Sequence, residues 1–200
     1  MTKEDIENYL IKLLINNCYE VLKLEYKNII VEKSESPDFI VSNNKISIGV
    51  EITRALDQNI KKVKNIRNDF FPGISFCSKS FENKAMSGKM IKDIFKRSNN
   101  KFAGGVSCYK VNQFEEKVIK DIINSIIRKN KKFNKYKSFD KNILFIHSEN
   151  RVSLDFNLVA QKISIFIKTN ELSFDYIFLK LGYNIYYFID NTYKSCKIKT

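Results

Sequence analysis

The 200-residue sequence predicts an α/β fold, with a mixed central sheet flanked by helices. Two apolar patterns support this class. Spacings of three and four residues, which are typical of helices, alternate along the chain with the period of two that is typical of strands. The resulting order is helix, three strands, helical segment, helix, strand, helix and two strands, and such mixed orders pack helices against a sheet.

The first element is a helix over residues 3–24, because its apolar residues recur on one face. Thr2 followed by Asp5 predicts the cap at its start. Three short strands follow, and the polar Ser42-Asn43-Asn44 predicts a hairpin turn between the second and the third. The expected strands cover 28–32, 38–41, 45–53, 142–147, 176–181 and 184–189, and the remaining helices cover 55–68, 82–97, 113–132 and 152–169.

The charge of the chain is concentrated in one segment. The formal net charge is +13, yet residues 1–60 carry −3, residues 61–141 carry +14 and residues 142–200 carry +2. The base composition of an AT-rich genome would spread lysines evenly, whereas a concentrated positive field is typical of a protein that binds a polyanion. The alternative is a solvated basic surface whose acidic partners lie elsewhere in the fold.

Composition also excludes several classes of protein. His147 is the single histidine, which excludes chemistry that needs two imidazoles. There is no apolar run long enough for a membrane span, and the acidic start does not resemble a signal peptide. The four cysteines form no CxxC pair, so we expect reduced thiols in a cytoplasmic protein: Cys18, Cys77, Cys108 and Cys196.

The candidate for chemistry is a pair of carboxylates, Asp38 and Glu51. If the hairpin pairs as expected, Asp38 begins one strand and Glu51 lies near the end of its antiparallel neighbour, at the same edge of the sheet. Glu51 is on the face opposite the apolar stripe, so we expect it and Gly49 to face a cleft or solvent. Two carboxylates with this placement suit Mg²⁺ or Mn²⁺. The alternative is an exposed acid pair at the mouth of a hairpin.

The stretch PDFIVSNNKISIGVEITR, together with the leading helix and the order of the strands, resembles the PD-(D/E)XK nuclease superfamily. It is similar to the subset with E-x-T in place of E-x-K, over about half of the chain. The resemblance implies an αβββαβ restriction-endonuclease-like core. We therefore expect a single nuclease-like domain over 1–200, with 55–111 as a basic helical insertion and 150–200 as a C-terminal extension.

The resemblance also implies roles for individual residues. Asp38, Glu51 and the backbone carbonyl of Ile52 are the expected metal ligands. An acid on the first helix often completes the site in this superfamily, and we expect Glu7 in preference to Glu20, although either would also suit the helix surface.

Thr53 departs from the pattern, since it occupies the position of the lysine that orients the attacking water and stabilises charge. Three alternatives remain open: a lysine from elsewhere, of which Lys129 and Lys132 are candidates, activation by the metal alone, or an inactive site. Phosphate contacts or plain surface positions are the competing interpretation of both lysines. The expected nucleic-acid contacts are Arg54, Lys84, Lys89, Lys92, Lys96, Lys129 and Lys132.

These observations predict a Mg²⁺- or Mn²⁺-dependent endonuclease that acts on nucleic acid, DNA ahead of RNA, in restriction, phage defence or as a toxin. The alternative is a catalytically inactive protein of the same fold that binds nucleic acid or a protein partner, and a basic structural protein is a third. We expect no membrane association. A homodimer is one possible oligomeric state.

Overall fold

The computed structural model describes residues 2–24, 28–56, 58–71, 86–97, 111–133, 139–148, 154–190 and 192–199. The chain divides into two compact units, one formed by Met1–Ala55 with Val118–Thr200 and the other by Leu56–Lys117. Lys84, Cys77 and Cys108 lie outside the described residues.

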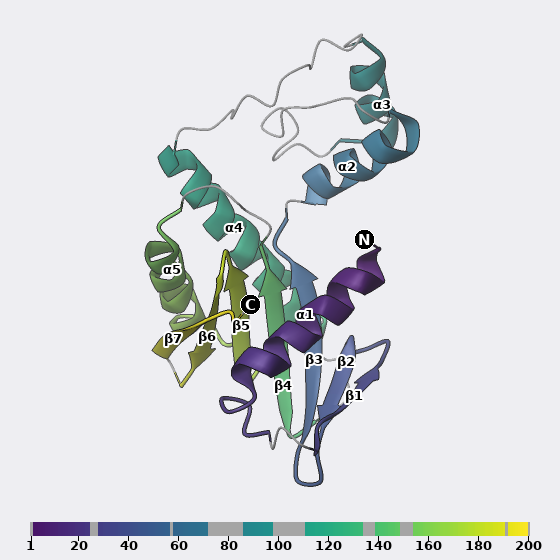
Figure 1. Cartoon of the computed structure of the whole chain (residues 1–200). Helices are drawn as coiled ribbons and strands as arrows, with labels where there is room; N and C mark the ends of the chain where they lie inside the picture. Colours follow the sequence, from purple (N-terminus) through teal and green to yellow (C-terminus); the bar gives the residue numbers. More distant parts are fainter. Residues whose placement is uncertain are drawn as a thin grey trace. The chain divides into compact units, whose positions relative to one another are not determined.

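The first unit is built on a seven-stranded mixed sheet with the order β1-β2-β3-β4-β5-β6-β7 (Figure 1). The three central strands β3, β4 and β5 are parallel, and all the other pairs are antiparallel. The general α/β class is therefore confirmed, while the restriction-endonuclease-like core stays a prediction. The strands are β1 (Ile30–Lys33), β2 (Phe39–Ser42), β3 (Ser47–Arg54), β4 (Lys141–His147), β5 (Tyr176–Leu181), β6 (Asn184–Ile189) and β7 (Thr192–Lys197).

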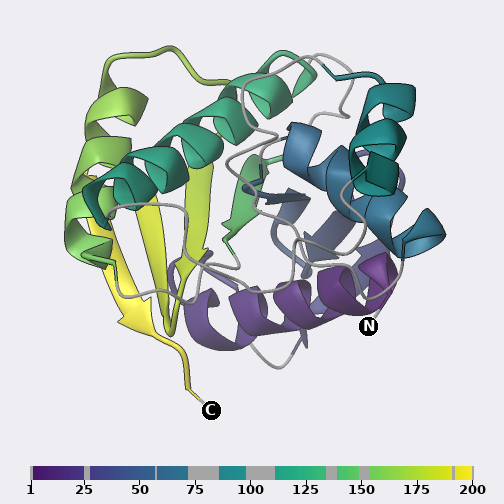
Figure 2. The same cartoon turned by 90° about the horizontal axis from the view of Figure 1, so that it is seen from above.

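Helices cover both faces of this sheet. Seen from above, α1 (Lys3–Cys18) lies on one side, and α4 (Val111–Asn130) and α5 (Phe156–Lys168) lie on the other (Figure 2). Apolar side chains of α1 pack against the alternate residues of the strands, so that the face under α1 forms one continuous core. Its buried members from β3 and β4 are Ile48, Val50, Ile52, Ile143 and Phe145.

The hairpin of β2 and β3 forms in the expected register. Phe39 pairs with Val50 and Ser42 with Ser47, and the side chain of Asn43 closes the turn by accepting hydrogen bonds from the backbone of Lys45 and of Ile46, both at 2.9 Å. This pairing brings Asp38, the residue before β2, next to Glu51 on β3.

The first helix is shorter than the sequence predicts. It begins with a capping box between Thr2 and Asp5 but ends at Cys18, whereas the apolar spacing predicts a helix to residue 24. Lys23 adopts a left-handed conformation with φ 55°, and the N–H of Leu24 donates to the carbonyl of Tyr19 at 2.9 Å. The last apolar residues of the pattern, including Leu22, are thus buried by a turn and not by a helix.

Two further expectations about the sheet are wrong. β3 is buried on both faces, so solvent, one of the two expected environments, is wrong: Glu51 contacts Lys129 of α4, and Gly49 lies against Phe139 and Pro37. A seventh strand, β7, follows the six that the sequence predicts. Its sequence TYKSCK lacks an apolar alternation because it forms an exposed edge of the sheet.

The second unit contains α2 (Gln58–Phe70) and α3 (Gly88–Arg97). They pack through Ile60, Val63, Ile91 and Phe95. The basic helix expected over 82–97 begins at Gly88, and residues 82–85 lie outside the described part. No helix in the described ranges has the length and apolar character needed to cross a membrane.

Candidate active site

The two carboxylates that the sequence singles out lie together at the open end of the β2–β3 hairpin. The Oδ2 atom of Asp38 accepts a hydrogen bond of 2.7 Å from the backbone N–H of Ile52. Because the N–H and C=O of one strand residue point toward the same neighbouring strand, the Ile52 carbonyl is directed to the same side as Asp38. Glu51 is only 5% exposed, so its carboxylate is held in a nearly dry environment.

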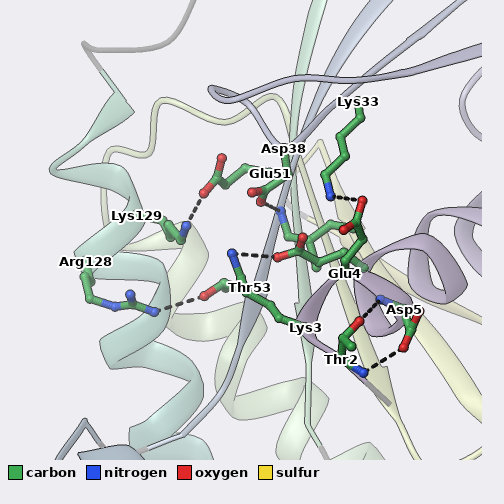
Figure 3. Close-up of polar contacts among 12 residues, drawn as sticks. Thr2, Lys3, Glu4, Asp5, Lys33, Asp38, Glu51, Thr53, Arg128 and Lys129 are labelled. Carbon is green, nitrogen blue, oxygen red and sulfur yellow. Dashed lines mark hydrogen bonds and ion pairs between the residues drawn. The ribbon is translucent and has the colours of Figure 1, made fainter.

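A third carboxylate comes from α1. Glu7 is 8% exposed and forms an ion pair of 3.0 Å with Lys3, one turn earlier on the same helix. The negative charge of Glu7 contributes to the raised pKa of Asp38. The charges of Glu7, Asp38 and Glu51 in turn raise the pKa of Lys3. The capped N-terminal end of α1 therefore lies beside the carboxylate pair (Figure 3).

One face of α4 supplies the opposite charges. The ammonium of Lys129 contacts Oε1 of Glu51, and the guanidinium of Arg128 donates to Oγ1 of Thr53 at 2.9 Å (Figure 3). Ser125 lies one turn earlier, with its hydroxyl 3.4 Å from the carbonyl oxygen of Arg54. Spacings of three and four residues place these α4 residues on one face of the helix. This face contacts the last residues of β3.

The carboxylates repel one another in this arrangement. Burial and the charge of Glu51 raise the pKa of the Asp38 carboxyl to about 6, and Glu7 adds to the rise. The hydrogen bond from Ile52 and the charge of Lys129 lower the pKa of Asp38 but do not cancel the increase. A site that holds negative charges close together at this cost is well suited to a cation.

The donor set suits a hard divalent cation. Mg²⁺ is commonly held by one or two carboxylates, with waters and substrate phosphates as its other ligands. No three Asp, Glu, His or Cys side chains of the described ranges form a group that could hold a metal ion on its own. Asp38 and Glu51 provide two carboxylates, the number that commonly holds Mg²⁺ where a substrate phosphate supplies other ligands, and the Ile52 carbonyl is a further oxygen on the same side.

Most of the other predicted residues lie apart from the carboxylate pair. Glu20 is exposed, lies in the turn after α1 and accepts a hydrogen bond from Tyr19, far along the helix from Glu7. Lys132 is exposed in the turn after α4, whereas Lys129 lies in the site. The predicted contact residues Lys89, Lys92 and Lys96 lie on α3, which belongs to the second unit.

Two residues of the site escaped the sequence interpretation. Lys3 is four residues before Glu7 on a helix, a spacing that could have suggested their ion pair. Arg128 is adjacent to Lys129, but only the position of α4 over β3 shows that it reaches Thr53. Comparisons with protein-family models, with curated proteins and with solved structures gave no match, so the geometry of the site carries the functional interpretation.

Proposed function

We propose that this protein is a metal-dependent phosphodiesterase that hydrolyses nucleic acid, with Asp38 and Glu51 as the metal-binding carboxylates. The observation that carries the proposal is the contact between Lys129 and Glu51. It supports the view that a lysine from α4 compensates for Thr53, which stands where the resembled superfamily has its lysine.

The residues of the site would divide the work as follows. Asp38, Glu51 and the Ile52 carbonyl would hold the ion on the side where Asp38 and Ile52 are already hydrogen-bonded. The chemistry supplied by a bound Mg²⁺ or Mn²⁺ is polarisation of a phosphoryl oxygen and activation of water. Lys129 would offset negative charge on the transferring phosphoryl group, because its ammonium lies against a carboxylate that would hold the ion.

Arg128 and Thr53 would act as positioning residues. The hydrogen bond between them ties α4 to β3 within one residue of Lys129. Lys129 therefore approaches Glu51 from a fixed helix. A fixed cation costs less reorganisation during the reaction than a mobile one, which is why its placement matters for the rate.

The direct experiment is cleavage of single- and double-stranded DNA and RNA in Mg²⁺, Mn²⁺ or EDTA. We expect wild-type activity to require the metal, and Asp38→Ala and Glu51→Ala each to abolish it. Activity that persists in EDTA, or in both variants, would contradict the assignment of the metal-binding carboxylates.

The role of Lys129 has a matched control on the same helix end. We expect Lys129→Gln to lower the cleavage rate at least a hundredfold, the usual effect of removing one group that stabilises transition-state charge. Lys132→Gln should leave the rate within about twofold, because Lys132 is exposed in the turn after α4. Equal effects of the two substitutions would show that Lys129 acts through general charge and not through the site.

The alternative function is binding of nucleic acid without cleavage. It is favoured by one observation, that Glu51 and Glu7 already have cationic partners in Lys129 and Lys3. A protein of this kind would bind nucleic acid in a salt-dependent manner with or without metal and would cleave none of the substrates.

A further inference from the structure

Three basic side chains form a row across the parallel strands. Arg54 pairs with His147 in β3 and β4, and His147 pairs with Lys180 in β4 and β5. Residues that are directly opposite in neighbouring strands project from the same face of a sheet, and strands are about 4.8 Å apart. Arg54, His147 and Lys180, which we name the basic row, are all half-buried at the carboxyl ends of their strands.

The backbone around the basic row is fixed. The N–H of Ala55 donates to the carbonyl of His147 at 2.9 Å, and the N–H of Ser148 donates to the carbonyl of Lys180 at 3.2 Å. Hydrogen bonding between the strands thus continues past Arg54 and His147. The basic row consequently lies at the carboxyl ends of hydrogen-bonded parallel strands. Ligands of α/β proteins commonly bind at this end of the sheet.

The basic row gathers like charges at one place. Burial lowers the pKa of Lys180, and burial together with the charges of Lys180 and Arg54 lowers the pKa of His147 to about 4. At neutral pH the row therefore consists of two cations and, between them, an uncharged imidazole that carries one N–H. This combination suits an anion with several oxygens, such as a phosphodiester, since the anion relieves repulsion and accepts hydrogen bonds.

The turn next to the row carries an exposed tyrosine. The ammonium of Lys180 donates to the carbonyl of Gly182 at 3.1 Å, in the turn between β5 and β6. Tyr183 is the following residue and is 75% exposed. Gly182 has φ 54°, which favours glycine, and the Tyr183 carbonyl accepts a hydrogen bond of 2.8 Å from Ile198. These contacts hold the backbone of Tyr183 close to Lys180 in the chain and leave its ring exposed.

We propose that the basic row and Tyr183 form a binding edge for a single-stranded segment of nucleic acid, with phosphates on the row and an unpaired base stacked on Tyr183. Aromatic rings stack on bases of any sequence when those bases are not held inside a duplex. Arg54 is three residues beyond Glu51 on the same strand, about 10 Å along it. In naming the substrate of the candidate site, this inference rests on the proposed function.

The test is equilibrium binding of a fluorescent oligothymidylate and of a duplex of equal length, both in EDTA. We expect Tyr183→Ser to weaken binding of the single strand about tenfold, the usual effect of losing one stacked base, and to leave duplex binding within about twofold. Tyr9→Ser is the matched control, because Tyr9 is also exposed but lies on α1. It should change neither affinity.

Lys180→Gln tests the row itself. We expect it to weaken binding of the single strand several-fold and to reduce the dependence of log K on log salt by about 0.7, the contribution of one phosphate contact. Lys162→Gln, on the exposed side of α5, is the matched control and should leave both quantities unchanged.

The inference is overturned if the single strand binds Tyr183→Ser and Lys180→Gln as tightly as it binds the two control variants. A preference for the duplex that neither substitution changes would also overturn it. Since EDTA removes the metal, these results are separate from the proposed hydrolysis. Wild-type protein that binds single strands through Tyr183 but cleaves nothing in Mg²⁺ would refute the nuclease and leave the binding edge standing.

Discussion

Asp38 is the residue at which the candidate site opposes stability. Its carboxyl is half-buried next to Glu51, and its pKa is raised to about 6 from an ordinary value of 3.8. An acid whose pKa is higher in the folded state destabilises the fold above that pKa, because its charged form is disfavoured there. The energetic cost of the charge at neutral pH is the counterpart of its readiness to bind a cation.

We therefore expect Asp38→Asn to stabilise the metal-free protein at pH 7.5 by about 1 kcal/mol, less than the full shift because Asp38 keeps some contact with solvent. The amide oxygen can still accept the hydrogen bond from Ile52. The gain should shrink as the pH falls from 6 to 4, where the wild-type carboxyl becomes protonated. Urea unfolding in EDTA at pH 7.5 and pH 4.5 measures both effects.

Asp140→Asn is the control of opposite sign. Asp140 is exposed, and hydrogen bonds from the backbone and hydroxyl of Ser47 lower its pKa. Its charged form is favoured by the fold, so the substitution should not stabilise the protein at pH 7.5. A destabilising effect of Asp38→Asn at that pH would contradict the strained state of its carboxyl.

Residues of the site could be predicted from the sequence where they are close to one another along the chain. Asp38 and Glu51 share one hairpin, so strand alternation and a turn suffice to bring them together. Lys129 could be named only as one of two candidates, because spacing along α4 does not show which residue reaches β3. Arg128 needs the packing of a helix that follows β3 by more than fifty residues, which no local pattern encodes.

Among the elements, β3 shows how tightly the hairpin of the site is packed. Gly49 lies on the same face as Glu51, and a Cβ atom added there would be 2.6 Å from Phe139 and 3.0 Å from Pro37. Glycine is thus required by close approach of neighbouring side chains. Pro37 directly precedes Asp38, so a side chain added at position 49 would press on the residue next to Asp38.

We expect Gly49→Ala to lower the free energy of unfolding by about 1–3 kcal/mol, since insertion of a methyl group into a filled space forces neighbours to move. It should also weaken cleavage, because Pro37 is displaced beside Asp38. Gly88→Ala is the control, with 3.7 Å to the nearest side chain, and should be neutral or slightly stabilising within α3. Equal denaturation curves for wild type and Gly49→Ala would contradict the close packing.

At this scale the sequence predicts buried elements well and edge elements poorly. β5 and β6 appear at the expected residues because they carry long apolar patterns. β7 has no such pattern, and the apolar residues after Cys18 satisfy helical spacing although a turn buries them. An apolar pattern alone does not show whether such residues are buried by a helix or by a turn, because either can place them against the core.

For the whole molecule, the distribution of charge is the feature from which we predict binding of nucleic acid. The excess of +14 over residues 61–141 includes α3, where Lys89 and Lys96 are exposed. Lys92 is half-buried and lies 3.3 Å from the centroid of the Phe70 ring, so it also contributes to packing within the second unit. Lys89 and Lys96 are consequently the better probes of nucleic-acid binding.

We expect the double substitution Lys89→Glu and Lys96→Glu to weaken binding of duplex DNA and to lower the salt dependence of log K by about 2, for two lost phosphate contacts. The matched control reverses Lys12 and Lys162, which are exposed on helices of the first unit and change the net charge equally. If both double variants give the same slope, the excess charge acts through the overall field and α3 has no specific role.

The two ends of α1 have different partners, and the helix therefore connects two distant parts of the first unit. Near its start, Glu7 lies beside the carboxylate pair, while at its end Cys18 lies 3.6 Å from Cys196 of β7, sulfur to sulfur. Asn17 also accepts a hydrogen bond of 2.9 Å from the backbone of Lys199. The helix that carries Glu7 therefore completes its packing only when β7, the last strand in the order of the sheet, is in place. A substitution that loosens the contact of α1 with β7 would thus act on the same helix that places Glu7 beside Asp38.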